Sequence, residues 1–381
     1  MARSGKRTAS RTAVRSLLAI QSGGVAYLGV AFGEYLSVFI PWFSSSHLLA
    51  SVAIGSWRFE PNGAQLAGVA AVLGLSAVNY VGVSQGARTQ GMLTAAKVLA
   101  LGGLIVVGLV LPARVAPQWT APLPSAGLPA GVALALLAVF GNFDGWYQAT
   151  MSAGEVRRPA RDLPLGMIGG TLGMTALYLL SNWVYLRALP ISAIGASPRV
   201  GEEAAAALLG PTGGRIMSGL VLISIFGCIS SSLVGASRVA LPMAQDRLFF
   251  QSFARVHPRF RTPTTSVVFM ALWSCGLVLT GSYGQIFTYA VLSALLFHAA
   301  TGAAVWRLRR IAPDAPRPYR VPGYPWVPAI FVLSTLAVVA NGLIDRPRES
   351  LLGLSVLVVG VPAYHWLRRI GVSRARAAGS E

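Results

Sequence analysis

The chain has 381 residues, of which 54% are hydrophobic and 11% charged, and its mean hydropathy is +0.61. This composition excludes a soluble globular protein, because too few polar side chains are available to cover the surface of one. The net charge of +19 suggests nucleic acid as a partner, but the distribution of that charge along the chain argues against it.

Runs of about 18 or more apolar residues predict membrane-spanning helices. About ten such runs follow one another, at residues 16–40, 64–83, 92–112, 129–150, 164–189, 216–243, 264–281, 284–306, 325–344 and 350–367. The loops between them are too short for a separate soluble domain, so residues 1–381 are predicted to form a single all-α integral membrane domain. Residues 44–57 are apolar but too short for a span, and we expect an interfacial or re-entrant helix there.

The basic residues are distributed unevenly between the loops. If successive loops alternate between the two faces of the membrane, 24 of the 31 Lys and Arg residues fall on one face and seven on the other. Such a bias is typical of multi-span proteins, whose basic loops stay in the cytoplasm. Both termini are therefore predicted to be cytoplasmic, with residues 1–15 as a flank and 368–381 as a tail. The Arg-rich and Ser-rich composition of residues 1–15 also resembles a transit peptide, but a flank of the first span is the simpler interpretation.

Lys97 lies about a turn and a half inside the third run, in a chain that contains only one other lysine, Lys6. An ionisable group at that depth is costly and usually faces a cavity or a partner. One interpretation is that the side chain reaches back to the headgroups. The other is a fixed internal cation, which can also release a proton because burial disfavours the charged form of a lysine.

The fourth run breaks at mid-depth, at Phe140-Gly141-Asn142-Phe143-Asp144-Gly145-Trp146. Two glycines, an amide and a carboxylate leave backbone groups without helical partners, and hydrocarbon cannot satisfy them. The break is therefore predicted to line a protein-enclosed cavity, which is where transporters bind their cargo. Asp144 could bind an amine or cap one half-helix. Asn142 and the free N–H groups of the second half-helix are suited to a carboxylate ligand.

Small residues in the fifth run are spaced for close helix packing. Gly166 and Gly170, like Gly169 and Gly173, are four residues apart and lie on one helix face. This spacing lets helix backbones approach one another, so packing is the predicted role of these four glycines.

The remaining polar residues of the spans favour structural roles. Ser230, Ser231 and Ser232 form a hydroxyl cluster in the sixth run, where bonding to the helix's own backbone is the default. His298, alone in the eighth run, is interpreted as a packed residue rather than a proton relay. Cys228 and Cys275 have no metal-ligand spacing, and no catalytic motif occurs, so we expect neither an enzyme, nor a metal site, nor a cofactor.

Four groups of motifs follow one another in order, at residues 144–146 with 154–164, 235–238 with 246–248, 257–263 and 317–325. Together they resemble the amino acid, polyamine and organocation (APC) permeases. Residues 144–164 are similar to the sixth helix of that family and the loop after it, 235–263 to the eighth helix and its following loop, and 317–325 to the link to the eleventh helix. The resemblance is greatest to the branch of bacterial amino acid permeases and the light chains of heteromeric amino acid transporters.

The resemblance implies a fold of five plus five helices in inverted repeats (the LeuT-like transporter fold), followed by two more helices. The ten runs then correspond to family helices 3–12, with residues 16–112 as a partial first repeat, 129–306 as the second repeat and 325–367 as the last two helices. The first two family helices have no counterpart in these runs. The broken first helix of the family carries a Gly-Ser-Gly segment that binds the substrate's carboxylate, whereas Gln21-Ser22-Gly23-Gly24 lies in the run that resembles helix three.

The resemblance also implies roles for single residues. Lys97 corresponds to a fifth-helix lysine whose ammonium replaces a sodium ion, and Ser231 and Ser232 fall near that ion or proton coupling site. The substrate would be bound by the break and by a residue of the tenth helix, namely Phe140, Gly141, Asn142, Phe143, Asp144, Gly145, Trp146 and Ser293. Gly141 replaces the bulky aromatic residue often found at the gating position, and Tyr147 follows the tryptophan where some members have asparagine, so side-chain preference does not transfer.

The function implied is secondary active transport of amino acids by alternating access, as proton-coupled symport or as exchange. The expected partners are a small-molecule amino acid, membrane lipid and either a proton or a counter-transported amino acid, with no nucleic acid, in the plasma (cytoplasmic) membrane. The alternative is an N-terminally truncated or misannotated permease fragment that inserts but does not transport by itself. A membrane enzyme or a channel has little support.

Overall fold

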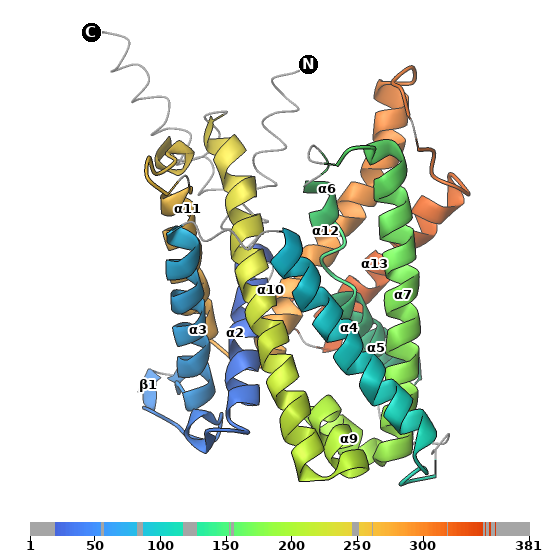
Figure 1. The fold of residues 1–381 in the computed structure, drawn as a ribbon. Helices are drawn as coiled ribbons and strands as arrows, with labels where there is room; N and C mark the ends of the chain where they lie inside the picture. The colour runs from blue at the N-terminus through green and yellow to red at the C-terminus, as the bar shows by residue number, and fades with distance from the viewer. Residues whose placement is uncertain are drawn as a thin grey trace.

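The computed structural model describes residues 20–54, 57–81, 87–116, 128–151, 153, 156–245, 251–260, 262–317, 319–345, 347, 350, 351 and 355. These residues form a bundle of long helices with one short antiparallel hairpin at its lower end (Figure 1). The elements are α2 (Ser22–Leu36), η2 (Pro41–Phe43), β1 (Val52–Ile54), β2 (Trp57–Phe59), α3 (Gly63–Tyr80), α4 (Ala87–Val110), α5 (Leu128–Asn142), α6 (Gln148–Met151), α7 (Pro159–Ala188), α8 (Ile191–Ala196), α9 (Val200–Leu209), α10 (Pro211–Gln245), η4 (Gln251–Ala254), α11 (Thr264–Val278), α12 (Tyr283–Ile311) and α13 (Trp326–Asp345).

The prediction of an all-α membrane fold is confirmed. The first nine predicted runs coincide with helices, and the tenth, at 350–367, lies outside the described residues except for three positions. Among the described helices, α3, α4, α7, α10, α12 and α13 contain stretches long and apolar enough to cross a membrane.

The expectation of a helix at residues 44–57 is wrong. This segment contains β1, which pairs with β2 so that Val52 lies opposite Phe59. The β-branched and aromatic residues here favour strands, a preference that a search for apolar runs does not register. Immediately after the hairpin, the Asn62 side chain accepts a hydrogen bond from the Gln65 N–H at 3.0 Å, and this capping box starts α3.

Helix α2 lies at the centre of the bundle, where it packs against α3, α10, α11 and α12. Its approach to α3 depends on glycines. A Cβ added to Gly33 would lie 2.1 Å from the carbonyl oxygen of Ala64, and one added to Gly68 would lie 2.5 Å from the carbonyl oxygen of Gly29. The two backbones therefore touch, and any side chain at these positions would force them apart.

The packing role predicted for the four glycines of α7 is not observed. In the described part of the chain, nothing lies within 4 Å of a Cβ built at Gly166, Gly169, Gly170 or Gly173. Helix α7 instead contacts α4 and, at its lower end, α9. The glycine spacing is compatible with close packing, but no described helix lies against that face.

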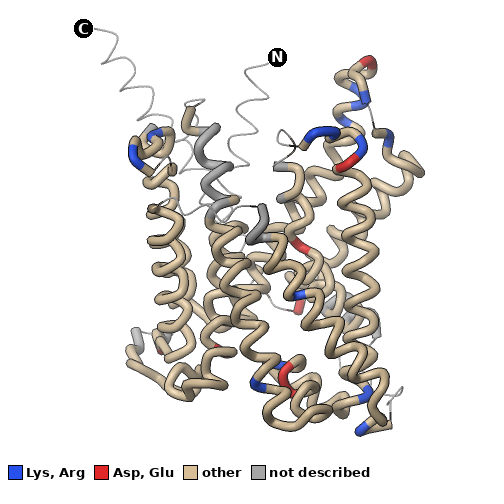
Figure 2. The backbone as a smooth tube through the Cα atoms, viewed as in Figure 1, with Lys and Arg blue, Asp and Glu red and all other residues tan. Residues whose placement is uncertain are grey.

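The charged residues of the described chain gather at the two ends of the bundle (Figure 2). The upper end in that view, where α7 begins and α12 ends, is rich in arginine, as the predicted alternation of the loops requires. Few charges lie between the two ends. Those few are therefore the ones whose surroundings need an explanation.

Candidate binding site at a broken membrane helix

Helix α5 ends at Asn142 and α6 begins at Gln148, so the chain leaves helical geometry over residues 143–147. The predicted break is confirmed, but it starts three residues later than expected. Asn142 is still helical, and the N–H of Phe143 donates to the carbonyl of Val139 at 3.0 Å. Gly145 has φ +97°, a backbone conformation that favours glycine, and it therefore lets the chain turn at this point.

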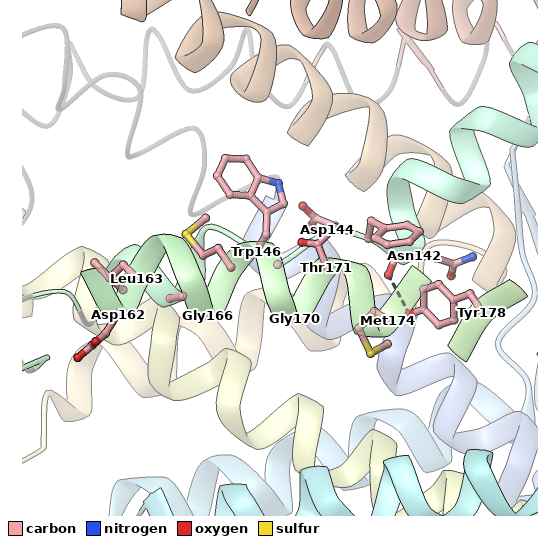
Figure 3. A pocket seen from close by; sticks show the side chains of 14 residues that line it. Asn142, Asp144, Trp146, Asp162, Leu163, Gly166, Gly170, Thr171, Met174 and Tyr178 are labelled. Atoms are coloured by element: carbon pink, nitrogen blue, oxygen red, sulfur yellow. Dashed lines mark hydrogen bonds between the residues drawn. The ribbon is translucent and has the colours of Figure 1, made fainter. Parts of the chain in front are cut away.

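The break lines a cavity of about 430 Å³ that it shares with one face of α7 (Figure 3). A cavity of this size suits a small organic molecule. Its lining combines apolar side chains with the polar groups of Asn142, Asp144, Asp162, Thr171 and Tyr178. Gly166 and Gly170 also border it, and the absence of side chains there widens the space. The break therefore faces a cavity, as predicted, but the cavity is not enclosed on all sides, since Asn142, Trp146 and Gly166 in its lining are exposed.

Two contacts hold α7 to the break. The Tyr178 hydroxyl donates to the Asn142 carbonyl at 3.2 Å, shown as the dashed line in Figure 3. The rings of Phe143 and Tyr178 meet edge to face, with 5.2 Å between their centroids. The hydrogen bond satisfies a carbonyl at the end of α5 that the interrupted helix leaves without a partner.

Five of the eight predicted substrate-binding residues line this cavity, namely Asn142, Phe143, Asp144, Gly145 and Trp146. Phe140, Gly141 and Ser293 lie elsewhere. A Cβ on Gly141 would lie 2.2 Å from the Cζ atom of Phe287, so this glycine lets α5 pack closely against α12.

The other two residues lie where α5, α12 and α13 pack together, Phe140 on α5 and Ser293 on α12. Phe140 packs against the apolar cluster that α5, α12 and α13 share. Ser293 is 1% exposed, and with Leu292 and Val339 it borders a different, much smaller cavity. Phe140 and Gly141 were included because they belong to the same stretch as the break, and Ser293 because of the family resemblance. Neither reason decides which side of a helix faces the cavity.

Asp144 faces His298, which the sequence analysis interpreted as a packed residue. The Nε2 atom of His298, on α12, lies 3.6 Å from Oδ1 of Asp144, and the two side chains are 12% and 22% exposed respectively. The imidazole also packs against Trp146 and Tyr147, with centroid distances of 5.4 and 5.7 Å. An ionisable ring in an apolar run often marks a functional position, and this is the feature of the sequence that could have identified His298.

Lys97 points into the bundle rather than only toward the headgroups. Its Nζ atom donates to Sγ of Cys228 on α10 at 3.0 Å, and the Ser231 hydroxyl donates to the Cys228 carbonyl at 3.0 Å. Ser232 is half-buried and lies one turn beyond Cys228 on the same helix. The structure thus brings Lys97 close to the predicted hydroxyl pair, although its partner is a thiol that the sequence gave no reason to single out.

A second polar contact involves the same stretch of α10. The Asn79 side chain on α3 donates to the Ser230 hydroxyl at 3.4 Å. Polar side chains of α3 and α4 therefore both contact α10 here.

A family model described as amino acid permease matches residues 2–360 of the chain. The serine/threonine exchanger SteT of Bacillus subtilis is 30% identical over 243 residues, which cover 62% of this chain and 54% of that protein. The branched-chain amino acid permease BcaP of the same bacterium is 28% identical over 55% of this chain and 45% of that protein. The human cystine/glutamate transporter is 24% identical over 58% of this chain and 44% of that protein. The chain thus spans about half the length of the curated relatives it matches.

Proposed function

Because the chain belongs to the amino acid permease family and is a multi-pass membrane protein, we propose that it carries out secondary active transport of amino acids by alternating access. The observation that carries this proposal is the cavity of about 430 Å³ at the broken helix. Its lining has the mixed character that a small zwitterion requires, with carboxylate, amide and hydroxyl groups among apolar side chains.

The amino group of the substrate would bind at Asp144, whose carboxylate lines the cavity and has an Oδ1 atom without a hydrogen-bond partner. Asn142, which also lines the cavity, would contribute its side-chain amide to binding of the substrate's carboxylate.

Lys97 would supply the fixed cation of the coupling site, with Ser231 and Ser232 beside it. The Lys97–Cys228 contact, with the Ser231 hydroxyl bonded to the Cys228 carbonyl, supports this coupling site. Symport with a proton and exchange against a second amino acid both fit this arrangement. The relatives include proteins named as exchangers and as permeases.

The proposal also covers the orientation of the bundle in the membrane and the assignment of its helices to repeats. The arginine-rich upper end of the bundle would face the cytoplasm, with both termini on that side of the plasma membrane, by the positive-inside rule. Residues 16–112 and 129–306 would belong to two inverted repeats and residues 325–367 to two further helices. Rocking of one group of helices against the other would open the cavity to each side in turn.

The direct test is uptake by the purified 381-residue chain in proteoliposomes, with radiolabelled L-serine, L-threonine and L-leucine as probes. We expect saturable uptake that prefers L over D enantiomers, whether driven by a proton gradient or by internal amino acid. Protein-free liposomes are the control. Absence of stereoselective uptake with both driving forces would favour the fragment that inserts without transporting.

Filling the cavity should block binding without unfolding the protein. Gly170→Leu places a side chain in the cavity, where no atom lies within 4 Å of the added Cβ. We expect at least a tenfold loss of substrate affinity and little change in thermal stability, because leucine also favours the helix over glycine by roughly 0.8 kcal/mol.

The matched control is Gly173→Leu. This glycine lies on the same helix, also has open space around it, and does not line the cavity. Substrate affinity should stay within about twofold of the unmodified chain, measured by a scintillation proximity assay in detergent. Equal losses in the two variants would show that the cavity along α7 is not where the substrate binds.

A further inference from the structure

Asp144 and His298 approach each other from two helices that the break brings together. Oδ1 of Asp144 and Nε2 of His298 are 3.6 Å apart, an ion-pair distance slightly longer than a hydrogen bond. Oδ1 is buried and has no hydrogen-bond partner, and the imidazole is flanked by the rings of Trp146 and Tyr147. A small movement of either side chain would close the pair.

Few other titratable groups lie near the pair in the described part of the chain. Tyr147 packs against the imidazole and Tyr178 lines the cavity, and tyrosines are neutral at physiological pH. The cavity's other carboxylate, Asp162, lies in the first turn of α7, at the opposite end of the cavity from Tyr178 in Figure 3. The Lys97 ammonium donates to Cys228 on α10.

A net charge on the largely buried Asp144–His298 pair would raise the free energy of the folded protein. One carboxylate and one imidazole carry no net charge when they hold one titrating proton between them, on either atom. With no titrating proton on either group, a buried anion remains. With one proton on each group, a buried cation remains. The arrangement in which the pair holds one proton is therefore favoured.

We propose that Asp144 and His298 share one proton, and that a bound amino acid keeps this proton on His298. A zwitterionic substrate brings one ammonium and one carboxylate, so its own net charge is zero. When its ammonium pairs with the Asp144 carboxylate, the proton stays on the imidazole of His298, and the pair together with the substrate remains neutral. This inference rests on the proposed function and assigns the titrating group to the break rather than to Lys97.

The first experiment needs no substrate. We would label the full chain with ¹⁵N-histidine and ¹³Cγ-aspartate in lipid nanodiscs and follow both signals by NMR from acid to alkaline pH. His298→Gln and Asp144→Asn assign the two signals among the four histidines and the aspartates. We expect the two groups to titrate with common midpoints, as strongly interacting sites do. Asp144→Asn should shift the His298 midpoint by more than about one pH unit.

The matched control is Asp162→Asn, which removes the cavity's other carboxylate, located in the first turn of α7. It should leave the His298 titration unchanged. Independent titration of the two groups, or a His298 midpoint that Asp144→Asn does not move, would overturn the shared proton, whatever the protein transports.

The second experiment follows the shared proton when substrate binds. Addition of L-serine or L-leucine to the ¹⁵N-histidine-labelled chain at neutral pH should move the His298 signal toward that of a protonated imidazole. Asp144→Asn should abolish this shift, and Gly173→Leu, which does not line the cavity, should behave as the unmodified chain. A His298 signal that moves toward neutral imidazole on binding would overturn this step. No binding of either probe would contradict the proposed function, while the first experiment still decides the shared proton.

Discussion

Replacement of Lys97 by alanine should lower concentrative uptake of amino acids at least tenfold and leave the bundle folded. The Lys97 ammonium donates to the Cys228 thiol between α4 and α10, and the Ser231 hydroxyl bonds the Cys228 carbonyl. Alanine removes this cation, so the proposed coupling step would lose its charged group. The measurement is accumulation in proteoliposomes under an imposed proton gradient, or under an imposed gradient of internal amino acid.

Two controls separate coupling from a general effect of charge loss. Lys6→Ala removes the only other lysine of the chain, outside the predicted spans, and should leave accumulation intact. Cys228→Ser preserves a hydrogen-bond acceptor for the ammonium and should retain most activity. Full accumulation by the Lys97→Ala protein would return Lys97 to a headgroup-reaching role.

Replacement of Gly33 by valine prevents α2 and α3 from packing and should cause the largest loss of stability among these variants. The added Cβ would lie 2.1 Å from the carbonyl oxygen of Ala64 and 2.5 Å from its Cα. These obstacles are backbone atoms, which cannot rotate away, so the cost should reach or exceed the upper end of the about 1–3 kcal/mol typical of an overpacked core. We expect a strongly lowered melting temperature and loss of monodisperse protein in detergent.

The control variant is Gly24→Val, on the same helix. Nothing lies within 4 Å of a Cβ built at Gly24, and the effect of a β-branched residue on the helix itself is the same at both positions. Its melting temperature should therefore stay near that of the unmodified chain. Similar melting temperatures for both variants would mean that α2 and α3 do not touch at Gly33 in the membrane.

The sequence predicted the helices well because each span must satisfy its own backbone hydrogen bonds in hydrocarbon. An apolar run of sufficient length is then enough to identify a span, and the runs at α3, α4, α7, α10, α12 and α13 became long apolar helices. The hairpin at β1 and β2 lies outside that constraint. Its strands depend on local propensity and pairing, and the sequence reading placed a helix there.

The broken-helix part of the candidate site was also predictable from the chemistry of hydrocarbon. Asp144, Gly145 and Asn142 stand out in an apolar run, and their polarity at that depth requires a cavity whatever the neighbouring helices are. Which helices form the other wall cannot be read from the run itself. His298 is more than 150 residues from the break in sequence, and only the packing of α12 brings its ring within 3.6 Å of Asp144.

The glycines also show a difference between what local spacing predicts and what helix packing decides. Spacing alone predicted close packing for Gly166, Gly169, Gly170 and Gly173, yet the backbone contacts occur at Gly29, Gly33 and Gly68. Spacing places residues on one face of a helix, but the position of the next helix decides whether that face is covered.

By itself, the sequence determined that this chain is a helical membrane protein with a break at mid-depth and ionisable groups inside it, because hydrocarbon penalises each unsatisfied polar group locally. The tertiary structure decided which of those groups meet. It joined Asp144 to His298, Lys97 to Cys228, and the break to the glycine face of α7. Contacts between helices depend on side-chain shape across distant segments, and no local pattern specifies them.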